Sequence, residues 1–203
     1  MAWFSRKPRD YERPDLAERT IDLITLDIEA GLSLADHQLL TSLPAFELLA
    51  LRAFIAQMLI ADRFPPAGDA FVREQLVVLN DQLPKRWQER SPKNEVEEMR
   101  QLLASRYIDC DGSIQGTIGK VLEIRIGAYA ECLIYFRGGP TGREFGDAIA
   151  FGARLVPRDP WSTIANMCAL YCGRPHDSII SLALVGVIAR TMDKLHPLLP
   201  RSR

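Results

Sequence analysis

The strongest signal along this chain is a set of three apolar stretches with helical spacing. They cover residues 44–61, 121–136 and 178–189, and each has too few polar positions for a helix that lies on a protein surface. No segment alternates apolar and polar residues between hairpin turns, as half-buried strands would. The sequence therefore predicts an all-α fold, a helical bundle of about eight helices in which these stretches are buried.

Capping residues, glycines and prolines set the expected helix ends. The first helix follows Pro14, is capped by Asp15, and ends at Gly31. Its predicted buried stripe consists of Ala17, Ile21, Ile24 and Ile28. Pro44 is expected to open the second helix, which runs to Asp62. A third is capped by Asp69 and ends at Pro84.

The remaining helices follow from the same signals. Their predicted starts are Ser91 or Asn94, the interval 113–120, Thr141, Asp159 and Asp177. The first of them is expected to bury Val96, Met99, Leu103 and Tyr107, and the predicted ends of the others are Phe136, Leu155, Gly173 and Pro197.

The chain divides into a short arm and one domain. Residues 1–14 are basic and hold two prolines, which predicts a flexible arm, and residues 15–203 form a single all-α domain. The polar segment 85–93 is the best place for a subdivision. Residues 56–71 also align without gaps on 130–145, an offset that Trp87 and Trp161 keep. This suggests a duplicated helical hairpin, with chance similarity of helix ends as the alternative.

Charge and cysteine content narrow the classes of function. With 25 basic and 26 acidic side chains among 203 residues, the chain has no global field to attract nucleic acid, and no nucleic acid partner is expected. The first twenty residues contain no apolar region of the kind that a signal peptide has, so we expect the four cysteines to be free thiols in a reducing cytoplasm. The longest uncharged apolar run, 178–189, is shorter than the roughly 20 residues of a membrane span.

No motif predicts catalysis or a cofactor. The acidic segment 109–114 resembles the middle of a calcium loop, but Tyr107 and Ile118 occupy the places of essential oxygen ligands. Cys168 and Cys172 lie one helical turn apart among apolar residues, which favours buried thiols over a metal site. We therefore predict no catalytic residue, no cofactor and no metal site.

Two groups of charged residues remain as weak site candidates. The first consists of charges that interrupt apolar helices: Arg52, Glu123, Arg125 and Glu131. Charges in such places are usually paired, so an arginine facing Glu123 or Glu131 is structural, whereas an arginine without an acidic neighbour suggests a bound anion. The second is the arm, with Trp3, Phe4, Arg6, Lys7 and Arg9. It suits weak contact with membrane headgroups or an acidic partner, or is a plain disordered terminus.

These observations favour a protein-interaction module. Many apolar residues at helical spacing, together with the lack of a catalytic motif, are typical of an adaptor, a chaperone or a regulatory subunit that binds another protein or associates with itself. One alternative is a small-ligand sensor or carrier with an anion held by Arg52 or Arg125. Another is an enzyme whose site, drawn from residues such as Glu123, Glu131, His37 and His176, forms only in three dimensions. An exposed apolar patch would favour the interaction module.

Overall fold

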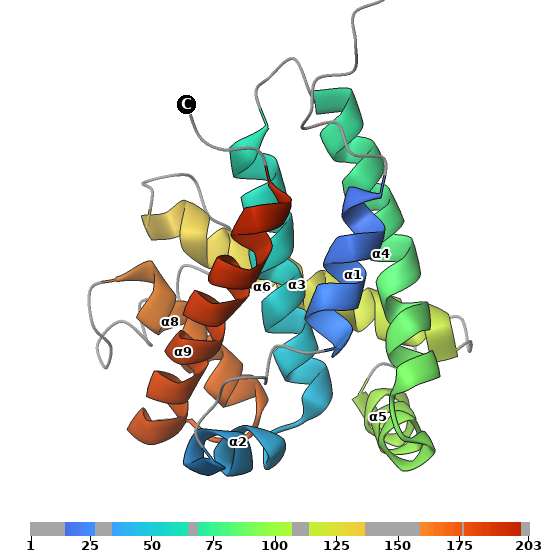
Figure 1. Ribbon diagram of the computed structural model, residues 1–203. Coiled ribbons are helices and arrows are strands. Elements are labelled where there is room, and N and C mark those ends of the chain that lie inside the picture. Colours follow the sequence, from blue (N-terminus) through green and yellow to red (C-terminus); the bar gives the residue numbers. More distant parts are fainter. Residues whose placement is uncertain are drawn as a thin grey trace, which may run out of the picture.

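The computed structural model describes residues 15–26, 34–64, 69–106, 114–136, 159–175 and 177–199. In these ranges the chain forms eight α-helices, one short 3-10 helix and no strand (Figure 1), so the all-α prediction is confirmed. The helices are α1 (Leu16–Leu26), α2 (Leu34–Thr41), α3 (Ala45–Arg63), α4 (Asp69–Arg90), α5 (Lys93–Arg106), α6 (Ile114–Phe136), α8 (Pro160–Tyr171), α9 (Ser178–Leu195) and the 3-10 helix η2 (His196–Leu198).

Helix α3 is the centre of the bundle. Twelve of its 19 residues are buried, and it contacts α1, α4, α6, α8 and α9. In Figure 1 it lies between the pair α8 and α9 on one side and the pair α1 and α4 on the other. Nearly continuous apolar sequence is required of a helix that is covered on most sides. The expectation that 44–61 is buried is therefore correct.

Helix α4 continues through Pro84 to Arg90, so the prediction that the helix ends at Pro84 was wrong. A proline inside a helix lacks one hydrogen bond and costs about 3 kcal/mol or more. Here the buried stripe of Leu79 and Leu83 extends past the proline to Trp87, which packs edge-on against Phe46 at 5.7 Å. Burial of the tryptophan offsets the cost of the proline.

Other helix starts also differ from the prediction. Pro44 precedes α3 as its N-cap and does not open it, and Asp69 is the first residue of α4 and not its cap. Helix α2 was not predicted; it is only eight residues long, and it precedes the buried Leu43 and then Pro44. Helix α5 begins at Lys93, so Asn94 lies inside the helix and does not cap it. Helix α6 begins at Ile114, within the predicted interval.

Helices α8 and α9 form an antiparallel hairpin whose ends at Asp159, Gly173 and Asp177 are the predicted ones. Helix α9 ends at Leu195, so the predicted end, Pro197, lies in η2. Asp159 accepts a hydrogen bond from Ser162 N at 2.9 Å, and Asp177 accepts two from the first turn of α9. Helix α8 closes at Gly173, whose φ of 73° suits glycine. The bonds from Gly173 N to Leu170 O and from Arg174 N to Ala169 O complete the turn.

Several predictions fall outside the described residues: the arm 1–14, Ile28, Gly31 and the helix 141–155. The second copy of the suggested repeat extends into the same region, so the duplication stays a prediction. Its two tryptophans occupy different places, because Trp87 lies near the end of α4 and Trp161 in the first turn of α8.

Candidate functional site

Arg125 on α6 and Glu47 in the first turn of α3 form an ion pair inside the bundle. Arg125 Nε lies 3.0 Å from Glu47 Oε2, and Arg125 Nη2 donates to Oε1 at 3.1 Å. The two side chains are only 11% and 6% exposed. Arg125 is thus one of the core charges singled out from sequence, but its acidic neighbour is Glu47 and not Glu123 or Glu131.

Aromatic rings also lie close to the Arg125 guanidinium. Its Cζ lies 3.7 Å from the centroid of the Tyr171 ring, which in turn meets Tyr129 edge-on at 6.0 Å. Phe54 of α3 packs against Tyr129 at 5.6 Å. A cation placed over a ring is attracted to its electron-rich face, more strongly where water is excluded. The arginine is therefore held between a carboxylate and an aromatic ring.

Buried thiols line the same part of the core. Cys168 donates to the carbonyl oxygen of Glu47 at 3.8 Å. Its hydrogen bond with Cys172 and its burial raise the pKa of the Cys168 thiol well above its usual range. Burial also raises the pKa of Tyr129, and that of Cys132 to about 11. Because all three groups stay protonated near neutral pH, they supply no ready nucleophile.

The other charges singled out from sequence are not gathered around this pair. Glu123 and Glu131 are both exposed on α6, and Glu123 accepts from Lys120 Nζ at 2.9 Å. Arg52 is half-buried on α3. The side chains of His37 and His176, and the arm residues Trp3, Phe4, Arg6, Lys7 and Arg9, lie outside the described residues.

Sequence reasoning missed Glu47 as a core charge. Glu47 is one of the few polar positions of its apolar helix, as Arg52 is, but only Arg52 is among the predicted site residues. The same criterion applied to Glu47 would have selected both members of the pair. Its position in the first helical turn is also favourable for a negative charge.

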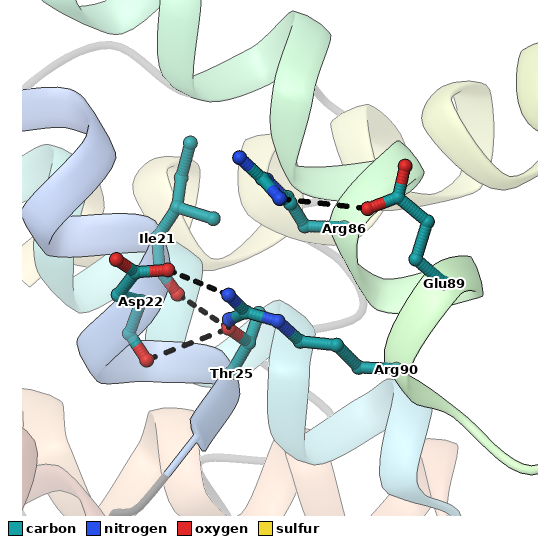
Figure 2. A network of polar contacts seen from close by, with 6 residues as sticks. All are labelled: Ile21, Asp22, Thr25, Arg86, Glu89 and Arg90. Carbon is teal, nitrogen blue, oxygen red and sulfur yellow. Dashed lines mark hydrogen bonds and ion pairs between the residues drawn. The ribbon is translucent and has the colours of Figure 1, made fainter.

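A second polar network joins α1 to α4 near the surface (Figure 2). Arg90 Nη2 lies 2.7 Å from Asp22 Oδ1, and Arg90 Nη1 donates to Thr25 Oγ1. The Thr25 hydroxyl donates to the Ile21 carbonyl at 2.7 Å. At the other end of α1, Gln75 Oε1 accepts from Ala17 N at 2.9 Å. Both contacts hold α1 against α4.

The outer side of α9 carries the two most exposed large apolar side chains among the described residues. Ile179 and Leu182 are 69% and 73% exposed, although α9 buries its opposite side against α3 and α8. The expectation that the whole stretch 178–189 is buried was therefore wrong for this side. We call the outward stripe the α9 face; it consists of Ile179, Leu182, Gly186, Ala189 and Asp193.

Charges lie at both ends of the α9 face. Arg174 and Asp177 precede the helix, whereas Arg190 and Asp193 lie in its last turns. Arg190 folds back toward Gly186, where an added Cβ would meet Arg190 Nη2 at 3.3 Å. Arg190 Nε is buried and has no hydrogen-bond partner among the described residues.

Other exposed apolar side chains lie on α4, α6 and α8. Val77 on α4 is 67% exposed and Leu170 at the end of α8 is 56% exposed. Helix α6 exposes Ile124, Ile134 and Tyr135, so the expectation that the whole stretch 121–136 is buried was wrong for this side of α6. Among the described residues, no three His, Cys, Asp or Glu side chains gather as metal ligands. None of the described helices combines the length and the apolar character needed to cross a membrane.

Comparison with family models, with curated proteins and with solved structures found no match to this chain.

Proposed function

We propose that this protein is a helical protein-interaction module, an adaptor, chaperone or regulatory subunit, that binds its partner through the α9 face. One observation carries the proposal: Ile179 and Leu182 are about two-thirds exposed or more on a helix that otherwise packs into the core. Exposing large aliphatic side chains next to each other is unfavourable unless another surface covers them. A cytoplasmic location is part of the proposal, supported by free thiols in the described core.

The geometry of the core favours this function over an anion carrier anchored by Arg125. The Arg125 guanidinium already donates to the Glu47 carboxylate and stacks on Tyr171. An incoming anion would have to displace a buried carboxylate, which is costly. The raised pKa values of Cys132, Cys168 and Tyr129 likewise give no support to an enzyme that uses these groups as nucleophiles.

Site-specific photo-cross-linking in cells tests the proposal. A photoreactive residue replaces Leu182, and in a control chain it replaces Glu97, an exposed residue of α5. We expect position 182 to form adducts with another polypeptide at native expression level, and position 97 to form few. Equal adducts at both positions, or none at 182, would contradict the proposal.

A further inference from the structure

Two thiols lie next to each other at the end of α8. Cys168 lies near the end of the helix, and Cys172, one turn later, is its C-cap residue. A hydrogen bond joins the two thiols. Cys168 is buried, whereas Cys172 is partly exposed, so an oxidant dissolved in water reaches Cys172 first. The third cysteine of the described residues, Cys132, is buried on α6.

The end of the helix has the backbone freedom that a bond between these two sulfurs needs. Residues four apart in a straight α-helix have Cα atoms about 6 Å apart, which is within the range for disulfides. The Cβ atoms have to approach to about 3.5–4.5 Å, closer than a straight helix brings them. Cys172 is held only by the last turn, where its N–H donates to Cys168 O at 2.9 Å, and Gly173 follows with a φ of 73°. Turns at helix ends open at low cost in free energy, so the last turn of α8 is able to rearrange.

The buried member of the pair contacts the centre of the bundle. The Cys168 thiol donates to the carbonyl oxygen of Glu47 at 3.8 Å, and the Glu47 carboxylate pairs with Arg125. A disulfide sulfur has no proton to donate, so oxidation of Cys168 removes its hydrogen bond to Glu47. Tyr171, the residue before Cys172, lies against the Arg125 guanidinium. A bond between the two sulfurs would therefore form next to the contacts that hold α8 on α3 and α6.

We propose that Cys168 and Cys172 form a reversible redox switch, in which a hydroperoxide oxidises Cys172 and Cys168 then closes a disulfide that opens the last turn of α8. The switch is independent of the proposed function, since it rests on α8 and not on the α9 face. A disulfide that distorts the backbone is reduced more readily than an unstrained one, which suits a reversible switch. In a reducing compartment, disulfides are usually transient and serve redox sensing or catalysis.

The reaction balances with the peroxide as the only oxidant. The Cys172 thiolate attacks one peroxide oxygen, the S–O bond forms, the O–O bond breaks, and an alcohol (water from hydrogen peroxide) leaves with the proton that Cys172 gave up. The Cys168 sulfur then attacks the sulfenic acid, the S–S bond forms, the S–O bond breaks, and the hydroxide leaves as water with the Cys168 proton. Two thiols have then lost two electrons, and the peroxide has gained them. Because the pKa of Cys168 is raised, we expect the second step to be the slower one, so that dimedone traps the sulfenic acid on Cys172.

Oxidation of the full, reduced chain by hydrogen peroxide tests the disulfide. We expect the intact mass to fall by about 2 Da, since two thiols lose two hydrogen atoms. Chymotrypsin cleaves between the two cysteines, after Leu170 or Tyr171, so the Cys168 peptide should stay joined to the Cys172 peptide until a reductant is added. We expect Cys172→Ser to abolish this product, and Cys132→Ser, the matched control on α6, to retain it. Circular dichroism of the variants checks that each is folded.

Amide hydrogen exchange tests the opening of the turn. In the reduced chain the amides of Cys172 and Arg174 donate to Cys168 O and Ala169 O, each at 2.9 Å. We expect these two amides to exchange at least about tenfold faster in the oxidised chain, the amides of α6 to keep their rates, and a reductant to restore both the mass and the rates. The proposal is overturned if Cys172 gains oxygen without forming the disulfide, if the disulfide joins another pair of cysteines, or if it forms without faster exchange at the end of α8.

Discussion

Arg125 and Glu47 are separated by 78 residues in sequence, yet Arg125 Nε and Nη2 donate hydrogen bonds to the Glu47 carboxylate inside the bundle. The pair links α6 to the first turn of α3, the central helix. It also holds the guanidinium against Tyr171, so that α8 is included in the same cluster. Three helices that contribute most of the core thus meet around one charge pair.

Removing one member of this pair should destabilise the protein strongly. Glu47→Ala leaves the Arg125 guanidinium buried without its carboxylate, and a broken buried pair typically costs about 3–5 kcal/mol. We expect Arg125→Ala to have a similar effect, with the additional loss of contact to Tyr171. Urea unfolding followed by circular dichroism would measure both changes.

Two control variants separate the cost of an unpaired buried charge from the cost of lost packing. The double variant Glu47→Leu, Arg125→Met replaces both charges by apolar groups, and we expect it to recover much of the lost stability. Glu123→Ala removes one member of an exposed pair with Lys120, and we expect a loss below about 0.5 kcal/mol. A double variant less stable than either single one would contradict this account.

Two glycines should respond to alanine in opposite directions. Gly127 lies inside α6, and an added Cβ there meets no atom within 4 Å. We expect Gly127→Ala to stabilise the protein by about 0.5–1 kcal/mol, because alanine loses less backbone entropy in a helix. Gly173 has a φ of 73°, so we expect Gly173→Ala to cost roughly 1–2 kcal/mol. Thermal melts would show the two shifts, and equal signs would contradict the prediction.

Protonation of Asp159 at low pH should lower the stability of the protein. Its hydrogen bonds with Ser162 at the start of α8 hold the pKa of Asp159 below its ordinary value. A lowered folded-state pKa gives stability that is complete above the unfolded value of about 3.9, and that is lost as the pH falls through the folded value. Asn caps a helix almost as well but does not titrate here.

The test compares unfolding of the wild type and Asp159→Asn over the acid range. We expect the two proteins to be nearly equally stable at about pH 7, and the variant to lose less stability on acidification below about pH 4. Asp159→Ala removes the cap itself and should cost about 1 kcal/mol at neutral pH. If the stabilities of wild type and D159N fall in parallel as the pH is lowered, Asp159 is not the source of the acid sensitivity.

The α8–α9 hairpin shows what local sequence can predict. Asp159, Gly173 and Asp177 act on the residues next to them, and the structure places all three at the expected helix ends. Their signals are short-range, since a cap bonds two or three residues ahead and a positive φ belongs to one residue. No tertiary contact is needed to interpret them.

Pro84 and Glu47 show where local reasoning fails. The helix continues through Pro84 because Trp87, three residues later, is buried against Phe46 of another helix. Glu47 acquires its role from Arg125, far away in sequence. In both cases the deciding energy is a long-range contact, and a single sequence contains no direct signal for such a contact.

The α9 face was missed for a different reason. Apolar residues occur all around α9, and a helix of that kind is usually buried on every side. The composition of the helix therefore indicates burial without saying which partner provides it. Within the described chain, α3 and α8 cover the inner side, while Ile179 and Leu182 remain exposed.

The core thiols should resist alkylation in the folded protein. Burial raises the pKa of Cys132 to about 11, so that only about one molecule in a thousand carries the thiolate at about pH 8. Cys168 is buried with its pKa also raised, whereas the Cys172 side chain is partly exposed. Peptide mapping after brief iodoacetamide treatment should therefore show Cys172 modified well before Cys132 and Cys168. The three should react at similar rates in concentrated urea, and native labelling of Cys132 as fast as that of Cys172 would contradict the packing of α6 described above.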